Sequence, residues 1–140
     1  MSDIMTPEQR SRCMSHIHSK NTKPEILVRK ELFRRGYRYR INVSNLPGKP
    51  DIVLPKYKTV IFVNGCFWHG HEGCKYFVLP KTNTVFWENK IRQTQQRDVD
   101  SILLLRAKGW FVIVIWECQI SKNHYFETMN EIELLILHKK

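Results

Sequence analysis

The length, composition and charge of this chain already exclude several classes of protein. Its 140 residues, 42% of them hydrophobic, can build one domain with a sizeable core, which excludes a disordered chain and makes disulfide bonds unnecessary for folding. Lys and Arg number 23 against 13 Asp and Glu, and the net charge of +10 favours a polyanionic partner, most often nucleic acid, over a solvated basic surface with no partner.

The sequence carries no sign of export or of a membrane anchor. No apolar run reaches the roughly 18 residues of a membrane span. The first residues lack the basic start and the apolar middle of a signal peptide. We therefore expect a cytoplasmic, nucleoid-associated protein, in which the four cysteines are not a disulfide framework.

The chain opens with a predicted basic helix. Thr6 is suited to cap it and Pro7 to occupy its first turn, and the helix would run to about His18. Its basic side chains, Arg12 among them, can contact phosphate groups or simply face water. We expect residues 1–21 to form an N-terminal arm that contacts DNA.

A second helix is predicted to begin at Thr22. Thr22 and Glu25 have the spacing of a capping box, in which a hydroxyl and a carboxylate each satisfy a backbone donor of the first turn. Gly36 ends the helix. Capping explains Glu25 better than a catalytic role does on this pattern alone. The predicted apolar face consists of Ile26, Leu27, Leu32 and Phe33.

Three strands are predicted next. Residues 37–43 alternate with the period of a half-exposed strand. A short apolar strand led by Asp51 covers residues 51–54, and a turn joins it to a second one at residues 59–63. This layout predicts an antiparallel hairpin, in which Asp51 lies near Val63 and Asn64.

The stretch from Gly65 to Cys74 is predicted to bind a metal ion. Thiolate and imidazole ligands suit Zn²⁺, which prefers four of them in a tetrahedron. The loop can supply three ligands, and Cys118, just after a later strand, is the expected fourth. A loop held by a metal would also keep its aromatic residues outward. The chemically distinctive residues of this loop are Cys66, Phe67, Trp68, His69, His71 and Cys74.

The remainder of the chain predicts a parallel strand pairing. A long helix over residues 84–108 separates the 59–63 strand from another at residues 110–116, which is predicted to be fully buried. A long crossover helix between two strands favours parallel pairing. With a last helix at residues 125–137, the order is that of an α/β protein with a mixed sheet flanked by helices, in a single domain over residues 1–140.

Several motifs together resemble a known family. Pro50-Asp51 followed by two strands has the layout of the PD-(D/E)xK nuclease core, although the acidic residue and the lysine usual on the second strand are missing, where the chain reads Phe62-Val63-Asn64. The complete set strongly resembles the very short patch repair (Vsr) endonucleases, relatives of those nucleases that nick DNA 5′ of the thymine in T·G mismatches, which arise by deamination of 5-methylcytosine. The resemblance implies a restriction-endonuclease-like fold and extends from Thr6 to about Cys118. Its motifs are Leu46–Asp51, Val60–His69, Phe86–Glu88, Gly109–Trp110 and Ile115–Cys118.

The resemblance implies a catalytic site. Asp51 and the backbone oxygen of Val63 would bind Mg²⁺, which prefers oxygen ligands. His69 would activate the attacking water, a task that imidazole suits near neutral pH. Glu25 matches a glutamate of the family's active site, and Asp98 matches a carboxylate around it.

Position 64 departs from the family, whose better-known members have histidine there. Asn64 can donate a hydrogen bond but cannot change its charge. We therefore expect the substitution to affect the rate more than the reaction.

The resemblance also completes the zinc site and implies contacts with DNA. Cys66, His71, Cys74 and Cys118 match structural zinc ligands, with Gly73 as a one-residue insertion, and this leaves His69 outside the zinc site. Three aromatic residues match side chains that the family wedges into the duplex beside the mismatch, with core packing as the alternative. They are Phe67, Trp68 and Trp87, and we expect Lys49 and Arg12 to add DNA contacts.

Two other functions remain open at this point. The chain could be a zinc-stabilised module that binds mismatched DNA without cutting it, with Asn64 as a sign of lost chemistry. It could also be a nuclease of the same fold that acts on another DNA substrate beside a restriction–modification system. We expect a monomer that acts on double-stranded DNA without contacting membranes, with mismatch-repair proteins as further candidate partners.

Overall fold

The computed structural model describes residues 22–41, 43–75, 77–120 and 124–138. The predicted helix at residues 6–18, and Arg12 with it, lies outside this part of the chain. No helix of the described residues is both long enough and apolar enough to cross a membrane. The elements are α2 (Lys23–Arg34), β1 (Ile52–Leu54), β2 (Thr59–Asn64), α3 (Thr84–Ala107), β3 (Phe111–Trp116) and α4 (Tyr125–His138), with short 3-10 helices at Pro55–Tyr57 and Glu117–Ile120.

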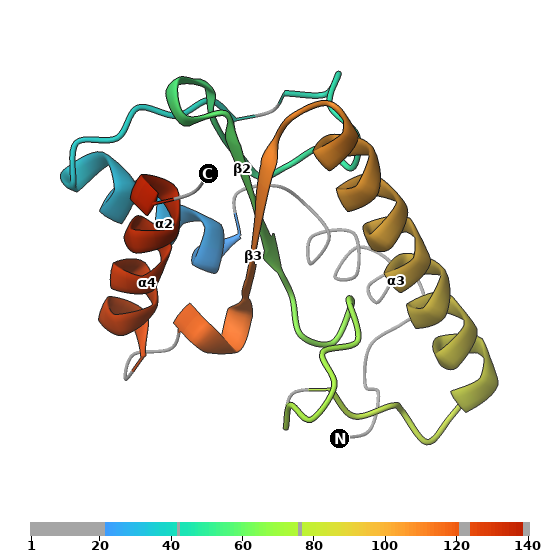
Figure 1. Ribbon diagram of the computed structural model, residues 1–140. Coiled ribbons are helices and arrows are strands. Elements are labelled where there is room, and N and C mark those ends of the chain that lie inside the picture. Colours follow the sequence, from blue (N-terminus) through green and yellow to red (C-terminus); the bar gives the residue numbers. More distant parts are fainter. Residues whose placement is uncertain (1–21, 42, 76, 121–123, 139–140) are drawn as a thin grey trace.

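A three-stranded sheet in the order β1-β2-β3 lies at the centre of the described chain (Figure 1). β1 and β2 are antiparallel, with Ile52 opposite Ile61. β2 and β3 are parallel, with Val63 opposite Ile115, and α3 is the crossover between them. The predicted hairpin and the predicted parallel pairing are both confirmed.

Helices cover both faces of this sheet, with α3 on one side and α2 and α4 on the other (Figure 1). Successive side chains of a strand point to opposite faces. Ile52 and Ile61 therefore pack in the core with α2 and α4, whereas Val53 and Val60 pack against Leu105 of α3. The mixed α/β architecture predicted from the order of elements is confirmed at this level.

Two strand predictions are wrong in detail. The described residues of the 37–43 segment form no strand, because Arg40 alone pairs with Val53, through two backbone hydrogen bonds of 2.8 and 2.9 Å. β3 is not fully buried: Ile113 and Ile115 are buried, but the residues between and beside them are half-buried. β3 lies at the edge of the sheet and has a neighbouring strand on one side only. A run of apolar residues in such a strand does not imply that all of them are buried.

Helix α2 begins as predicted, but only Leu32 of its predicted apolar face is buried. The Thr22 hydroxyl accepts a 3.5 Å hydrogen bond from the Glu25 N–H, which caps the helix. The buried apolar side chains are Val28 and Leu32, whereas Phe33 is 56% exposed. The buried face of α2 also carries Glu31, which forms ion pairs with Arg34 and Arg35 of the same helix end.

Candidate active site and metal centre

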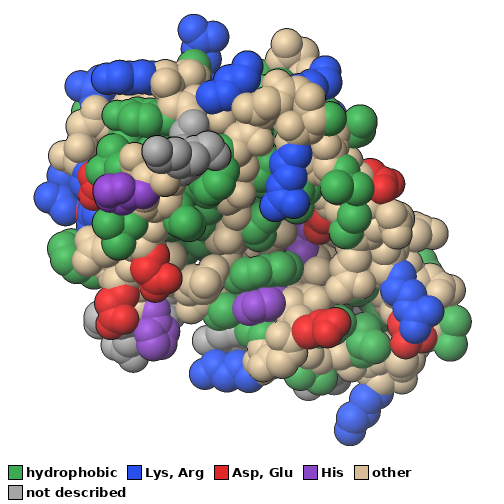
Figure 2. Space-filling model, viewed as in Figure 1, with side chains coloured by type: hydrophobic (Ala, Val, Ile, Leu, Met, Phe, Trp, Pro, Cys, Tyr) green, Lys and Arg blue, Asp and Glu red, His purple; other side chains and the backbone are tan. Residues whose placement is uncertain are grey.

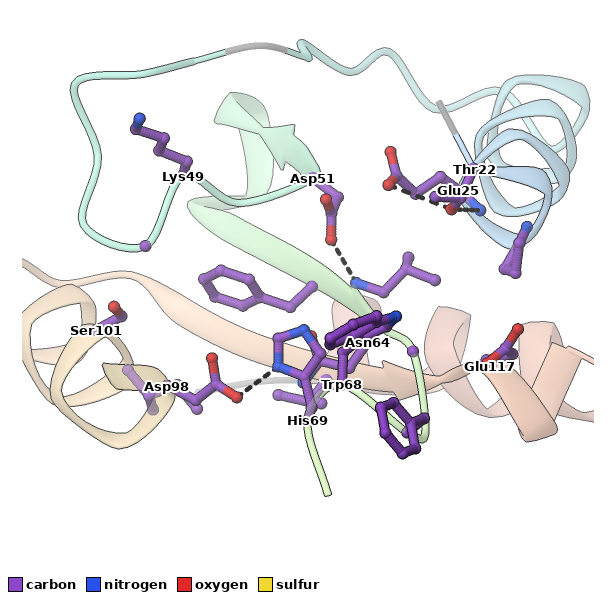
Figure 3. Close-up of a pocket in the computed structure, with 18 residues that line it drawn as sticks. Thr22, Glu25, Lys49, Asp51, Asn64, Trp68, His69, Asp98, Ser101 and Glu117 are labelled. Atoms are coloured by element: carbon purple, nitrogen blue, oxygen red, sulfur yellow. Dashed lines mark hydrogen bonds and ion pairs between the residues drawn. The ribbon is translucent and has the colours of Figure 1, made fainter. Parts of the chain in front are cut away.

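A pocket of about 360 Å³ opens between the start of α2, the end of β2 and the middle of α3 (Figure 3). Its walls come from segments that are far apart in the sequence, so only the folded chain can form it. All described residues that the resemblance implies in catalysis line this pocket: Glu25, Asp51, Val63, Asn64, His69 and Asp98.

The loop before β1 carries Asp51 into the pocket. Gly48 has a φ of 73°, and a Cβ atom added there would lie 2.7 Å from the Cβ of Ser101 on α3. Glycine therefore lets the loop pass close to α3 in a left-handed conformation. Lys49 also has a positive φ, of 50°, and is an exposed residue of the pocket lining.

Asp51 is held at the open end of the hairpin by the neighbouring strand. Its Oδ2 accepts a 2.7 Å hydrogen bond from the Val63 N–H (Figure 3). Burial raises the pKa of Asp51 to about 7, the hydrogen bond from Val63 opposes this rise, and the nearby Glu25 carboxylate adds to it. A poorly solvated carboxylate with a second one beside it is a favourable place for a cation.

Glu25 and Asn64 complete this side of the pocket. Each is buried, with a relative exposure of 7%. The Thr22 hydroxyl donates a 3.3 Å hydrogen bond to Oε1 of Glu25, so the residue belongs to the N-terminal turn of α2 and borders the pocket at the same time. Glu25 therefore takes part in the cap of α2 and also lines the pocket.

His69 is paired with Asp98 across the pocket from Asp51. The Nδ1 atom of His69 lies 2.6 Å from Oδ2 of Asp98 on α3 (Figure 3). When Nδ1 carries the proton, it donates to this carboxylate, and Nε2 is left as an acceptor. The pair therefore has the geometry of an imidazole oriented by a carboxylate.

Four Cys and His side chains form a cluster separate from the pocket: three of them belong to the loop between β2 and α3, and the fourth follows β3. The ligand atoms of Cys66, His71, Cys74 and Cys118 all lie within 4.8 Å of one another, a set whose size and chemistry fit a tetrahedral zinc ion. Burial, with neighbouring thiols adding to it, raises the pKa of Cys66 to about 12. A buried thiol of this kind becomes a thiolate only when a cation compensates its charge.

The two histidines of the loop, His69 and His71, have different neighbours. Nδ1 of His71 lies 3.5 Å from the Sγ of Cys118, and its ring stacks on Trp116 with a centroid separation of 4.1 Å. His69 is not part of the Cys/His cluster. His71 therefore lies in the Cys/His cluster, and His69 lines the pocket.

The three predicted DNA-wedge residues form one aromatic cluster. The ring centroids of Phe67 and Trp68 are 5.1 Å apart, and the Trp87 ring at the start of α3 lies 5.7 and 5.6 Å from them. All three side chains are half-buried, and none belongs to the two hydrophobic cores. Phe77 and Phe86 extend the cluster through edge contacts with Phe67 and Trp87.

The structure adds contacts at the loop that the sequence reasoning missed. The Gln95 side chain donates a 3.0 Å hydrogen bond to the carbonyl oxygen of Gly70, and Oε1 of Glu117 accepts a 3.3 Å hydrogen bond from the Cys66 N–H. Gln95 lies in a run of polar helix residues that carries no distinguishing signal. The one hint for Glu117 was its position beside Cys118.

Basic side chains lie at separate places on the face of the molecule shown in Figure 2. Acidic side chains between them are fewer. On α3, the exposed basic residues include Lys90, Arg92 and Arg97. Exposed basic side chains of this kind can contact the phosphate groups of a polyanion.

Comparisons with known proteins agree with this arrangement. The family described as DNA mismatch endonuclease Vsr matches residues 2–75. The chain is 53% identical to the type II nicking enzyme V.NmeAIP of Neisseria meningitidis, over 88% of this chain and 87% of that protein. It is 46% identical to the type II nicking enzyme V.XorIIP of Xanthomonas oryzae, over 86% and 88% of the two chains.

A further relative carries the name of the family itself. The DNA mismatch endonuclease Vsr of Escherichia coli is 38% identical over 86% of this chain and 76% of that protein. The match of the family to more than half of the chain, together with relatives of this identity and coverage, establishes the relationship. The chain belongs to the Vsr family of DNA mismatch endonucleases, and it is a DNA endonuclease.

Proposed function

We propose that this endonuclease uses Mg²⁺ to nick double-stranded DNA 5′ of the thymine in a T·G mismatch. The observation that carries the proposal is the single pocket in which Asp51 and Glu25 face the His69–Asp98 pair. A cation site and an oriented imidazole on either side of one cavity are the parts that hydrolysis of a phosphodiester requires. We also propose that the protein has a restriction-endonuclease-like fold and that it acts as a monomer.

Asp51 and the Val63 carbonyl would hold the magnesium ion. The Val63 N–H donates to one oxygen of Asp51, and the Glu25 carboxylate lies beside the same group, so a cation here would have two carboxylates close to it. The N–H and C=O groups of a strand residue point to the same edge, so the Val63 carbonyl is directed to the side of Asp51. A magnesium ion here would supply positive charge that stabilises the extra negative charge of the phosphate in the transition state.

His69 is the proposed general base. With Nδ1 donating to Asp98, its Nε2 can take a proton from a water molecule in the pocket. The water oxygen forms a bond to phosphorus, and the bond between phosphorus and the leaving sugar oxygen breaks. Asp98 stabilises the imidazolium that results, because its carboxylate faces Nδ1.

Asn64 and Glu25 have supporting places in this scheme. Asn64 can donate a hydrogen bond to a phosphate oxygen, but it cannot protonate the leaving oxygen, which then takes its proton from water. Glu25 adds negative charge next to Asp51 and so strengthens the attraction for a cation.

A zinc ion bound by Cys66, His71, Cys74 and Cys118 would have a structural role. The four residues complete a tetrahedral set, so the site has no open position for substrate. The ion would join the loop to the end of β3, where Cys118 lies. Zinc would thus hold the segment that carries both His69 and the aromatic residues.

Selectivity would come from the aromatic cluster and affinity from basic residues. Phe67, Trp68 and Trp87 are proposed to enter the duplex beside the mismatch, where a wobble pair costs less to unstack. Phosphate contacts from basic side chains provide binding that does not depend on sequence. We include Lys49, Arg12 and the N-terminal arm of residues 1–21 among these contacts.

A nicking assay tests the proposal. Duplexes that differ only in one T·G or T·A pair would be incubated with the wild-type protein and with Asp51→Asn, with and without Mg²⁺. We expect a nick 5′ of the mismatched thymine in the wild-type reaction with Mg²⁺. Asp51→Asn should abolish this nick and leave mismatch binding intact or tighter, because affinity depends mainly on basic and aromatic contacts.

Each alternative function has its own result in this assay. Mismatch binding without any nick under all conditions would identify a binding module. Equal cutting of the T·G and T·A duplexes would identify a nuclease of another specificity. An active Asp51→Asn variant would show that Asp51 is not a metal ligand.

A further inference from the structure

Two polar side chains on one face of α3 hold consecutive residues of the metal-binding loop. Asp98 lies 2.6 Å from Nδ1 of His69, and Gln95 donates a 3.0 Å hydrogen bond to the carbonyl oxygen of Gly70. Residues three apart on a helix are neighbours on its surface, so Gln95 and Asp98 form a pair of adjacent contacts. One acts on a side chain of the loop, and the other acts on its backbone.

Gly70 brings the loop directly onto the helix. It is buried and has a φ of 62°, and an added Cβ atom would collide with the Gln95 amide and with the buried side chain of Ile91. Glycine is the residue that tolerates this conformation and this close approach. The hydrogen bond from Gln95 therefore joins two segments that are already in van der Waals contact.

The loop also meets the start of α3 through side chains, in the ring contacts of Phe67 and Trp68 with Trp87. Its turn is shaped by internal backbone hydrogen bonds, such as those from the His69 N–H to Gly65 and from the Gly70 N–H to Phe67. The four proposed zinc ligands come from the loop itself and from Cys118 after β3. Asp98 holds a side chain that can rotate about its own bonds. Among these contacts, Gln95 is the one that ties the loop backbone to the helix that carries Asp98.

We infer that Gln95 is a positioning residue for His69. Its hydrogen bond to Gly70 keeps the backbone next to His69 at a set distance from α3, so that Nδ1 meets Asp98 while Nε2 faces the pocket. The inference rests on the proposed role of His69 as general base. A displacement of about 1 Å in a reacting group can cost about 10²-fold in rate, so one hydrogen bond at this place has a measurable effect.

Neighbouring glutamines provide a matched pair of variants. Gln95→Met keeps the length of the side chain and the helix propensity but removes the donor. Gln96→Met makes the same change one residue on, where the side chain is exposed and donates to Asp100 of the same helix. Rates would be measured in single-turnover reactions on a T·G duplex, at saturating enzyme with Mg²⁺ and zinc-loaded protein.

We expect Gln95→Met to lower the single-turnover rate by about 10- to 100-fold. Its affinity for the duplex and its zinc content should stay within about twofold of the wild-type values, because the residue contacts neither DNA phosphate nor metal in this scheme. Gln96→Met should cut at the wild-type rate. Gln95→Glu, which turns an acceptor toward the Gly70 carbonyl, should be at least as slow as Gln95→Met.

Proton NMR can show directly whether Gln95 affects the His69–Asp98 hydrogen bond. The Nδ1 proton in the short His69–Asp98 hydrogen bond should give a downfield resonance, assigned by its absence in His69→Ala. We expect this resonance to shift or broaden in Gln95→Met and to be unchanged in Gln96→Met.

The outcomes separate this inference from the proposed function. Gln95 variants that cut at the wild-type rate and keep the resonance, beside an inactive His69→Ala, would overturn the inference alone. Gln95 variants that lose zinc or unfold would overturn it too, because the residue would then be structural. A fully active His69→Ala would overturn the proposed role of His69 and, with it, the inference.

Discussion

His69 and His71 are two residues apart, yet their side chains lie in different chemical surroundings. His71 directs Nδ1 to the Sγ of Cys118 and stacks on Trp116, whereas His69 directs Nδ1 to Asp98. The loop sequence alone left either histidine available to the metal. The folded chain distinguishes them, because His69 meets the Asp98 carboxylate of α3 and His71 meets the Cys118 thiol that follows β3.

We expect His71→Ala and His69→Ala to fail in different ways. His71→Ala should lose bound zinc and melt at a lower temperature, because a structural zinc ion contributes to folding. His69→Ala should keep its zinc and its melting temperature but lose about 10²- to 10⁴-fold in single-turnover rate, the usual contribution of a general base. Elemental analysis, thermal unfolding and nicking rates check both variants.

Glu72, an exposed residue of the same loop, supplies the control. Glu72→Ala should change neither zinc content nor rate. If His69→Ala lost its zinc while His71→Ala kept it and still cut DNA, the assignment of the two histidines would be reversed.

At the scale of the elements, a network of charged and aromatic side chains joins α2 to α4. Arg35 contacts Glu31 at 2.6 Å and Glu133 of α4 at 2.8 Å, and the Tyr37 hydroxyl donates a 2.9 Å hydrogen bond to Glu133. Glu31 is 6% exposed, so its charge depends on these partners. The hydrogen bond from Arg34, assisted by Arg35, lowers the pKa of Glu31 to about 2, although burial opposes the shift.

Glu31→Gln should therefore destabilise the protein in a pH-dependent way. The folded state lowers the pKa from 4.5 to about 2, so the carboxylate stabilises the fold above pH 4.5, and this contribution is lost as the pH falls toward about 2. We expect a cost on the order of 1–3 kcal/mol near neutral pH, because Arg35, whose side chain is 11% exposed, loses a charged partner.

Urea unfolding at about pH 7 and about pH 4 measures this difference. The difference in unfolding free energy between wild type and Glu31→Gln should narrow at the lower pH, and chelator in all samples would remove any bound metal from both proteins. Glu131→Gln, an exposed position on α4, is the control and should change little. A gap that is constant or that widens in acid would show that the ion pairs do not stabilise α2 against α4.

On the scale of the whole molecule, DNA affinity and mismatch selectivity are expected to have different sources. The net charge of +10 provides salt-dependent attraction to any duplex. The cluster of Phe67, Trp68 and Trp87 unites the loop with the start of α3 and adds no charge. Variants of the rings should therefore change selectivity without changing the electrostatic part of binding.

Phe67→Ala and Trp68→Ala should each lower the preference for T·G over T·A by about tenfold. Stacking of a base on an aromatic ring is worth roughly 1–3 kcal/mol, and the proposed wedge acts at the opened step. The dependence of log affinity on log salt should barely change, since no charge is removed. Binding of both duplexes over a series of salt concentrations measures the two quantities together.

Phe33→Ala, at an exposed aromatic residue on α2, is a suitable control and should leave both quantities unchanged. If Phe67→Ala and Trp68→Ala misfolded or weakened all duplexes equally, the rings would be packing residues and the wedge would be wrong.

Local patterns in the chain were enough to predict most elements and their pairing. The long polar-to-apolar helix, the hairpin around Pro55–Tyr57 and the parallel return of β3 all follow from periodicity, turn residues and the length of the crossover. Cys66, His71 and Cys74 were recognisable as metal ligands because thiols and imidazoles at short spacing suit zinc, and Cys118 was the remaining candidate for a fourth ligand. These features depend on neighbours in the sequence or on rules of connection.

The remaining features depend on contacts between distant segments, which spacing does not encode. Val28 and Leu32, rather than Phe33, face the core because α4 and the sheet select that side of α2. Residues 37–43 alternate like a strand, yet Arg40 alone finds a backbone partner in β1. The meeting of His69 with Asp98, and of Gly70 with Gln95, arises only where α3 packs against the loop, because hydrogen bonds and close packing between distant residues form only when the folded chain brings them together.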